Sequence, residues 1–306
     1  MSVFMAASTL CLVLTSAVHG VDEPRMVDLE YTFRTGDPLR YEVSRRSVMS
    51  QSMGAQLSMM SESFVSDVTR ERIGEKDDGS LIIRQVTDSF TYREATPAGE
   101  FDFDSGSEED QGKRGDERVR GFYESLGWDI EYVLSPKGEV IGVENLNSLG
   151  KRVGEIAQED ARVELEDTFS LESLIQEVNP FMHLLPDEQV GKGDTWVSTF
   201  TIIDEGMEMT AKQNMLVQSV LDWKDGHYVG VKFEGDVDMQ LPPEFPPFME
   251  VTESTIEGSF VFNTHYGAVS DYNSTIKFVF SGTPGPGMDT VTLVMSLHMR
   301  YELQRD

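Results

Sequence analysis

The chain has little cysteine and little positive charge. Among its 306 residues there is one cysteine, and 25 Lys and Arg face 54 Asp and Glu, for a formal net charge of −29. A surface this acidic repels phosphate backbones, and no basic run interrupts it, so nucleic-acid binding is excluded. The same charge disfavours anionic membrane surfaces, whereas it attracts cations and basic partners.

Long hydrophobic runs are also scarce. The run Val3–Val18 is too short to span a bilayer comfortably, and no other stretch approaches about 18 uninterrupted apolar residues. Small and then charged residues follow it, which is typical of a secretory signal peptide over residues 1–20, although no Lys or Arg precedes it. An apolar terminal strand or helix is the alternative. Removal of the signal removes Cys11, so we expect a secreted or periplasmic protein without disulfides, thiol chemistry or a transmembrane span.

Alternation of apolar and polar residues is the dominant pattern of the remaining chain. It is clearest near the C-terminus, where one face holds Val291, Leu293, Met295, Leu297, Met299, Tyr301 and Leu303. It recurs over residues 39–43, 209–223 and 229–241, and indicates long antiparallel strands with one buried face. Over residues 145–179 the spacing becomes helical, with two helices, the second ending at Asn179-Pro180. The sequence predicts an α+β, mainly β fold: a long curved antiparallel sheet, half-barrel or clam-like, with two or more helices across one side.

The pattern predicts one β-rich domain over residues 21–306. Two related halves, 28–144 and 190–303, would be joined by the helical segment 145–179, because Gly36-Asp37 and Gly138 in the first have counterparts in Gly193-Asp194 and Gly267. Residues 94–117 hold nine acids against Lys113 and Arg114. We expect this stretch to be a disordered, solvated acidic insert.

Three stretches carry a resemblance. They are Tyr31-x-Phe33-x-x-Gly36-Asp37-x-x-x-Tyr41, then Val133-Leu134-Ser135-Pro136-Lys137-Gly138-Glu139-Val140, then Leu185-Pro186 followed by Val190-Gly191-x-Gly193-Asp194-x-Trp196. Together they resemble a bacterial family of secreted proteins known only as a domain of unknown function. The resemblance implies an extracytoplasmic curved sheet similar to the half-barrel of periplasmic lipoprotein-localisation carriers. It transfers no catalytic residue.

Catalytic and metal-binding signatures are missing from the sequence. His183, His227, His265 and His298 are widely separated, and the acids that begin at Asp102 do not follow the EF-hand spacing. No strained serine turn of the G-x-S-x-G type occurs. We therefore expect no enzyme, metal or cofactor, and a hydrolase with dispersed acids is a minor alternative.

Two features indicate binding of an apolar molecule. Many of the 16 methionines fall in predicted strands or at their ends, where flexible thioethers suit a surface for varied apolar ligands or fill a core. They include Met49, Met53, Met59, Met60, Met207, Met209, Met215, Met239, Met295 and Met299. The second feature is the proline-rich segment 241–249, which forms either the lip of a cleft or a rigid connection. The expected ligand-binding residues are Phe245, Phe248, Met249, Met239, Met295 and Met299.

Two functions follow from these features. In the first, a non-enzymatic extracytoplasmic protein binds a lipid, acyl chain or other apolar or amphipathic ligand in a cleft of the curved sheet. In the second, an acidic scaffold in the cell envelope recruits a basic protein partner or divalent cations through its acidic loop and helices.

Overall fold

The structure is a computed structural model that describes residues 25–34, 37–156, 159–182, 185–204, 207–223, 226–241 and 245–304. The predicted signal peptide over residues 1–20, with Cys11, lies outside these ranges, as do His183 and part of the proline-rich segment, residues 242–244.

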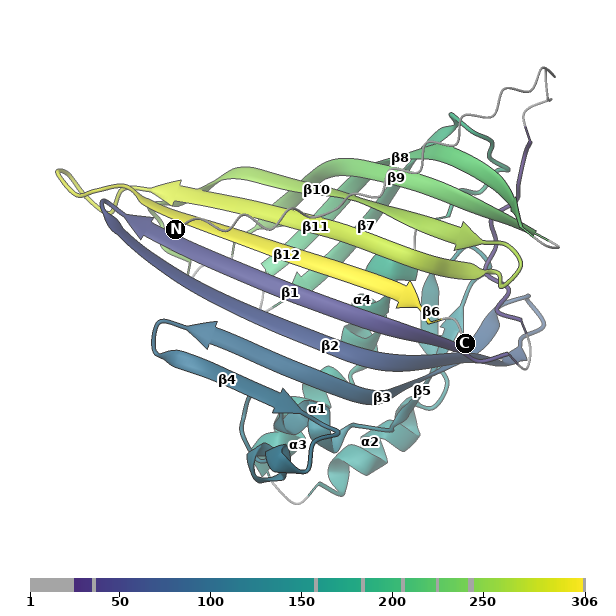
Figure 1. Ribbon diagram of the computed structural model, residues 1–306, viewed down its shortest axis with the longest axis horizontal. Helices are drawn as coiled ribbons and strands as arrows, with labels where there is room; N and C mark the ends of the chain where they lie inside the picture. Colours follow the sequence, from purple (N-terminus) through teal and green to yellow (C-terminus); the bar gives the residue numbers. More distant parts are fainter. Residues whose placement is uncertain are drawn as a thin grey trace.

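One antiparallel sheet of twelve strands dominates the molecule (Figure 1). The strands are β1 (Leu39–Met53), β2 (Gln56–Glu75), β3 (Leu81–Thr96), β4 (Gly99–Asp104), β5 (Asp129–Leu134), β6 (Val140–Val143), β7 (Thr195–Asp204), β8 (Met207–Trp223), β9 (Gly226–Gln240), β10 (Met249–Asn263), β11 (Ala268–Gly282) and β12 (Val291–Leu303). Their order is β6-β5-β3-β2-β1-β12-β11-β10-β9-β8-β7, and β4 pairs with β3. Each half of the chain forms a contiguous half of the sheet, and the two halves meet where β1 pairs with β12.

The sheet is open and strongly curved, so that its two edge strands approach the same helix. Helix α4 (Leu171–Met182) contacts both β6 and β7, and Figure 1 shows it behind the central strands. The other helices are η1 (Glu109–Lys113), α1 (Arg120–Glu124), α2 (Leu146–Gly154) and α3 (Glu159–Thr168). The predicted long curved antiparallel sheet with helices is therefore confirmed.

Two details of the helical prediction were wrong. The stretch 145–182 holds three helices, α2 to α4, where the apolar spacing had indicated two. Helix α4 also continues past Asn179-Pro180 to Met182. Proline disfavours a helical conformation of the preceding residue, but buried Leu174 and Val178 keep this helix packed against the core.

The acidic stretch 94–117 is ordered, which corrects the prediction of a disordered insert. It forms β4 and η1, and Phe103 of β4 is buried with Phe90, Tyr92 and Val119 in a second, small core. In β4, Phe101 and Phe103 alternate with acids, so the strand has one apolar face although its composition is acidic. The prediction rested on the average charge of the stretch and therefore missed this alternation.

Most buried side chains form a single core on the concave side of the sheet. The core joins alternate residues from parts of most strands to Leu149 of α2, Leu165 of α3 and Leu174 of α4. Residues 25–34, called here the N-terminal segment, supply four more core residues in strict alternation, namely Val27, Leu29, Tyr31 and Phe33. The helices and the N-terminal segment therefore cover the concave face.

The two ends of the sheet differ. At one end, called the capped end, the N-terminal segment crosses three connections: Val27 exchanges two hydrogen bonds with Val190, Tyr31 N donates to Pro136 O at 2.8 Å, and Thr32 N donates to Gly267 O at 3.0 Å. At the opposite end, called the hairpin end, the β1–β2 and β11–β12 turns project beyond the other strands (Figure 1).

Candidate functional site

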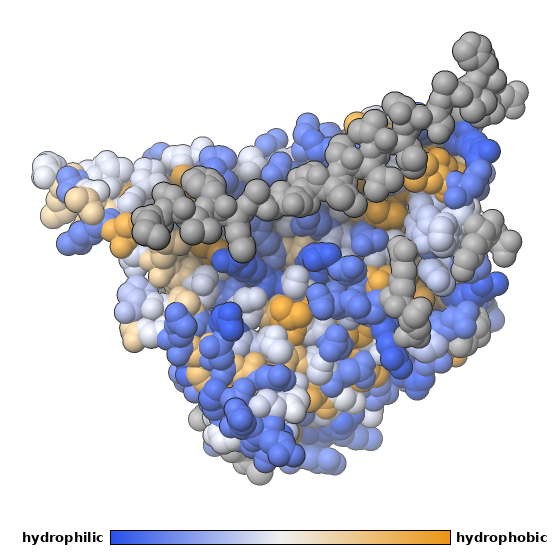
Figure 2. All heavy atoms as spheres, viewed as in Figure 1, coloured by the Kyte–Doolittle hydropathy of each residue, from blue (hydrophilic) through white to orange (hydrophobic). Residues whose placement is uncertain are grey.

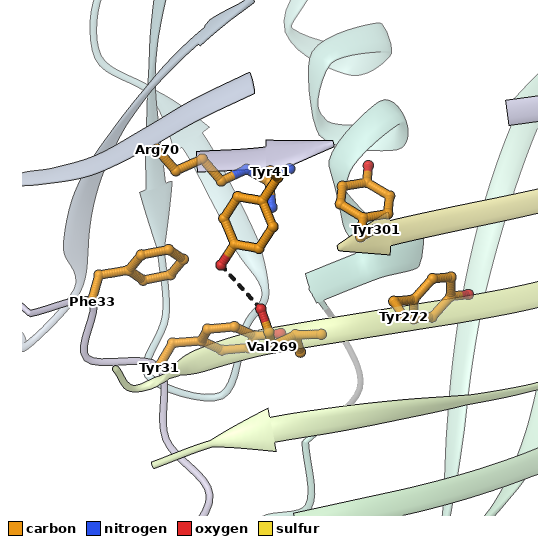
Figure 3. A pocket seen from close by; sticks show the side chains of 7 residues that line it. All are labelled: Tyr31, Phe33, Tyr41, Arg70, Val269, Tyr272 and Tyr301. Carbon is orange, nitrogen blue, oxygen red and sulfur yellow. Dashed lines mark hydrogen bonds between the residues drawn. The ribbon is translucent and has the colours of Figure 1, made fainter. Parts of the chain in front are cut away.

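A cluster of aromatic residues around one arginine lies at the capped end (Figure 3). Tyr31 and Phe33 come from the N-terminal segment, Tyr41 from β1, Arg70 from β2 and Tyr301 from β12; Val269 and Tyr272 of β11 complete the lining of a small cavity. The buried Arg70 guanidinium lies 5.4 Å from the Tyr41 ring centre and 5.3 Å from that of Tyr301, and its Nε donates to Gln85 Oε1 at 2.8 Å. Cation–π attraction therefore ties β1, β2 and β12 together.

Three tyrosines of this cluster, Tyr31, Tyr41 and Tyr272, stay protonated. Burial raises the pKa of Tyr272 to about 12 and raises the pKa values of Tyr31 and Tyr41 further above their usual range, although Arg70 opposes the rise for the last two. Tyr41 donates its hydroxyl to Val269 O at 3.0 Å. The Tyr31 hydroxyl is buried with no hydrogen-bond partner among the described residues.

The cavity is too small for an organic ligand. Its volume is about 10 Å³, which is the space of roughly one water molecule. The aromatic cluster therefore closes the capped end of the core.

The concave face loses its cover toward the hairpin end. There one cross-strand row runs through Met60 of β2, Met49 of β1, Met295 of β12 and Phe278 of β11, each directly opposite the next. Phe278 is 6% exposed, Met49 and Met295 are half-buried, and Met60 is 39% exposed. Cross-strand neighbours on one face stand about 5 Å apart. These four side chains form a continuous apolar strip, called here the methionine row.

A positive charge lies on the same face as this strip, about 13 Å from Met49 along β1 and beyond the row that holds Glu62 and Ser47. Arg45 lies on the same face of β1 as Met49, directly opposite Met299 of β12 and Phe64 of β2. It is exposed and forms no ion pair within the described residues. An apolar strip with a cation on the same face has the chemistry to hold a molecule with an apolar chain and an anionic head.

A groove lies at the margin of the sheet, where β2 extends beyond the end of the β3–β4 hairpin. The β3–β4 hairpin ends at Thr96–Gly99, so residues 56–60 of β2 pair only with β1. The groove has a volume of about 490 Å³ and is lined by Arg46 and Val48 of β1, residues 57–61 of β2 and residues 95–97. Arg46, Val48 and Ser61 lie on the opposite face of the sheet from the methionine row, and Met60 at the margin belongs to both the row and the groove lining.

The structure places all six predicted ligand-binding residues on the main core. Met249 and Met299 are buried, while Met239, Met295, Phe245 and Phe248 are half-buried and pack against the core. The Phe245 ring lies 5.2 Å from that of Phe280. None of the six lines the cavity or the groove. Of the six, only Met295 belongs to the methionine row, and their role in binding stays a prediction.

Met49 and Met60 are among the methionines of the predicted strands but not among the six expected ligand-binding residues, and Arg45 was not predicted at all. A signal for them was present, because residues 43–61 contain Arg45, Arg46 and four methionines but no acid, in a chain with 54 acids. What could not be seen was the register that places Met49 between Met60 and Met295.

Metal ligands do not converge in the part of the chain that the structure describes. No group of three or more His, Cys, Asp or Glu side chains there could hold a metal ion. His298 is exposed and contacts Thr275, and His265 contacts Arg34. None of the described helices is long and apolar enough to cross a membrane.

Comparison with known proteins gives distant structural likenesses and a family. Lipovitellin, described for its lipid–protein interactions, is 12% identical with a TM-score of 0.46 over 90% of this chain, which spans only 26% of the lipovitellin chain. DynF from the dynemicin biosynthesis pathway of Micromonospora chersina is 8% identical with a TM-score of 0.20 over 95% of this chain and 94% of its own. At these scores neither likeness carries a functional argument. No curated protein matches. Residues 78–266 match a family of unknown function (DUF6263), and the chain belongs to that family.

Proposed function

We propose that the protein is a non-enzymatic, extracytoplasmic binder of amphipathic molecules, and that the methionine row with Arg45 is its binding surface. The observation that carries the proposal is the unbroken row Met60–Met49–Met295–Phe278, whose side chains pass from exposed to buried along one face. A methylene group gains about 0.8 kcal/mol when it leaves water for such a surface. An acyl chain laid along the row therefore binds without a deep cavity.

The chemistry of the row favours a ligand with a mobile apolar chain. Thioether side chains adapt to varied apolar shapes, and three of the four residues of the row are methionines. Arg45 supplies the one polar interaction that would orient the ligand, with its carboxylate or phosphate toward the guanidinium. We expect a fatty acid or a single-chain phospholipid to be the class of ligand.

The test is titration of the purified protein with a fluorescent fatty acid. A Met49→Gln/Met60→Gln variant should bind about tenfold more weakly, because an apolar strip that receives the chain becomes polar. The matched control is Val48→Gln/Ser61→Gln, which changes the neighbouring positions on the opposite face of the same two strands and should bind as the parent does. Equal binding by both variants, or no binding by the parent, would overturn the proposal.

Arg45 has its own test. Arg45→Gln should weaken binding of the fatty acid about fivefold, which corresponds to about 1 kcal/mol for an exposed charge pair. It should leave binding of the matching fatty alcohol unchanged, because the alcohol has no charge. A parallel loss for both ligands would mean that Arg45 acts through packing and not through its charge.

The alternative of an acidic scaffold receives less support from the structure. Acids of the stretch 94–117 pair with bases nearby: Asp110 with Lys113 at 2.6 Å and Asp116 with Arg118 at 2.7 Å. Arg118 holds the pKa of Asp116 at about 2, well below its usual value, mainly through their hydrogen bond. Charges paired in this way are less available to a basic partner.

A further inference from the structure

The hairpin end presents apolar side chains to solvent. Met53, Leu57 and Met59 of the β1–β2 hairpin are 46%, 68% and 56% exposed, and Met288 of the β11–β12 turn is 62% exposed. The two turns lie together, since the carboxylate of Asp289 packs against Gly54. Figure 2 shows hydrophobic atoms at this projecting tip, on the left of the view. These four side chains are called here the apolar tip.

The charge of this end differs from that of the whole chain. Residues 43–61 contain no acid, and between Tyr272 and Tyr301 the sequence has one acid, Asp289. Arg45 and Arg46 are exposed and form no ion pair within the described residues. In a protein of net charge −29, these two hairpins can approach another surface with little electrostatic repulsion of their own.

The shape and composition of the tip fit a bilayer better than a protein. A stable protein interface buries about 800 Å² on each side and is centred on Trp, Tyr or Arg anchors. The tip is the narrow end of two hairpins, and neither residues 43–61 nor residues 281–291 contain an aromatic residue. A fluid bilayer closes around a few inserted side chains, so it needs no complementary pocket.

The arginines stand at a suitable distance behind the tip. On β1, Arg46 precedes Ser50, the residue directly opposite Met59 of the tip, by four residues, which is about 13 Å of strand, and Arg46 lines the groove with Leu57, Met59 and Met60. A long arginine stem keeps its charged group in the polar layer while nearby side chains enter the apolar layer. Phosphate groups of lipids would then meet Arg45 and Arg46.

We propose that the hairpin end docks on an electrically neutral lipid bilayer and inserts Met53, Leu57, Met59 and Met288 below the phosphate layer. The bilayer is neutral and not anionic because the remaining surface carries the negative charge of the chain and would be repelled. The methionine row opens at this same end, but docking does not require that a ligand be bound. The inference therefore goes beyond the proposed function.

The experiment is flotation of the full chain with phosphatidylcholine vesicles. A variant with Met53, Leu57, Met59 and Met288 all changed to Ser should lose vesicle binding by at least about tenfold, since four inserted apolar groups become polar. The matched control changes Ile141, Val163, Val197 and Leu221 to Ser, because these residues are 49%, 52%, 53% and 60% exposed on other elements. The control should float as the parent does.

Other outcomes separate the proposal from its competitors. Addition of phosphatidylglycerol should weaken flotation at low salt, and stronger flotation would overturn the neutral-bilayer assignment. Equal flotation of the tip variant and the control would overturn the role of the tip. If the parent fails to float but sedimentation shows a dimer that the tip variant loses, the tip docks on a second copy and the bilayer proposal is wrong. Vesicle binding without fatty-acid binding would contradict the proposed function and leave the bilayer proposal standing.

Discussion

The capped end and the hairpin end are built from the same strands yet have opposite surfaces. On β1, Leu39 and Tyr41 are buried, whereas Met49 and Met53 on the same face are half-buried or exposed. Toward the hairpin end this face also carries Arg45, Ser47 and Gln51. The difference therefore comes in part from the strand itself, and in part from the N-terminal segment and helices, which cover one end and not the other. One face of a strand thus forms core where other elements cover it and an exposed apolar surface where they do not.

The variant with the largest expected effect removes the ring of Tyr31 at the capped end. Tyr31→Ala should lower the free energy of unfolding by about 3–5 kcal/mol, since a large side chain buried at the capped end leaves a cavity. Tyr31→Phe should stay within about 1 kcal/mol of the parent, because the hydroxyl has no partner among the described residues. Urea unfolding measures both. A comparable loss for both variants would show that the hydroxyl, and not the ring, fastens this end.

Two glycines sharpen the comparison between the ends. Gly267, at the capped end, has φ +61° and an added Cβ would collide with Thr32. Gly267→Ala should therefore cost about 2–4 kcal/mol, from a left-handed backbone and a clash. Gly287, at the hairpin end, has φ +79° with open space around it, so Gly287→Ala should cost only about 1 kcal/mol. Thermal unfolding of the two variants side by side checks this, and equal costs would mean that the N-terminal segment is not held at Gly267.

An ion pair makes the stability of the capped end depend on pH, and its expected effect is smaller than those of the preceding variants. Arg25 of the N-terminal segment pairs with Asp222 at the end of β8, and this hydrogen bond holds the pKa of Asp222 below its usual 3.8. Because the pKa is lower in the folded protein, the stabilisation is present above about pH 4 and is lost as the pH falls through the lowered pKa. Acid should lower the protection of residues 25–27 against hydrogen exchange, measured relative to the intrinsic exchange rate at each pH.

The matched variant for this pair is Asp222→Asn. It should show the lower protection already at neutral pH and lose the further fall in acid, whereas protection in β1 near Met53 should be the same in both proteins. An acid response that survives in the variant would assign it to another group.

The smallest expected effect is at the hairpin end. Leu57→Ser should change the free energy of unfolding by less than about 0.5 kcal/mol, because the side chain is already 68% exposed. Chemical denaturation measures it. A loss above about 2 kcal/mol would show that this end is covered in solution and would remove the contrast with the capped end.

Much of the fold could be predicted from alternation alone. The faces of β8, β9 and β12 follow from their apolar residues, and the predicted face of β12 is the one that packs on the core. The three glycines of the proposed repeat that the structure describes, Gly138, Gly193 and Gly267, all have positive φ, as turn residues should. Whether the two halves are related stays a prediction.

The candidate site was harder to predict, because it depends on pairing between distant strands. Met49 and Met295 are 246 positions apart in sequence and directly opposite in the sheet. No local pattern fixes such a register. Composition misled at β4, where acids alternate with Phe101 and Phe103, and proline misled at α4, which continues beyond Pro180. In each case packing against the rest of the molecule outweighed the local preference.

Helix α4 also determines how this sheet meets other chains. An edge strand offers unpaired backbone groups to any extended peptide and is a route to aggregation. Helix α4 contacts both β6 and β7, which are the first and last strands in the order of the sheet, so one helix lies against two edge strands. Its detachment would uncover two edges in a single step. Conditions that melt α4 should therefore turn an isolated molecule into a template for intermolecular β-pairing before the central strands themselves unfold.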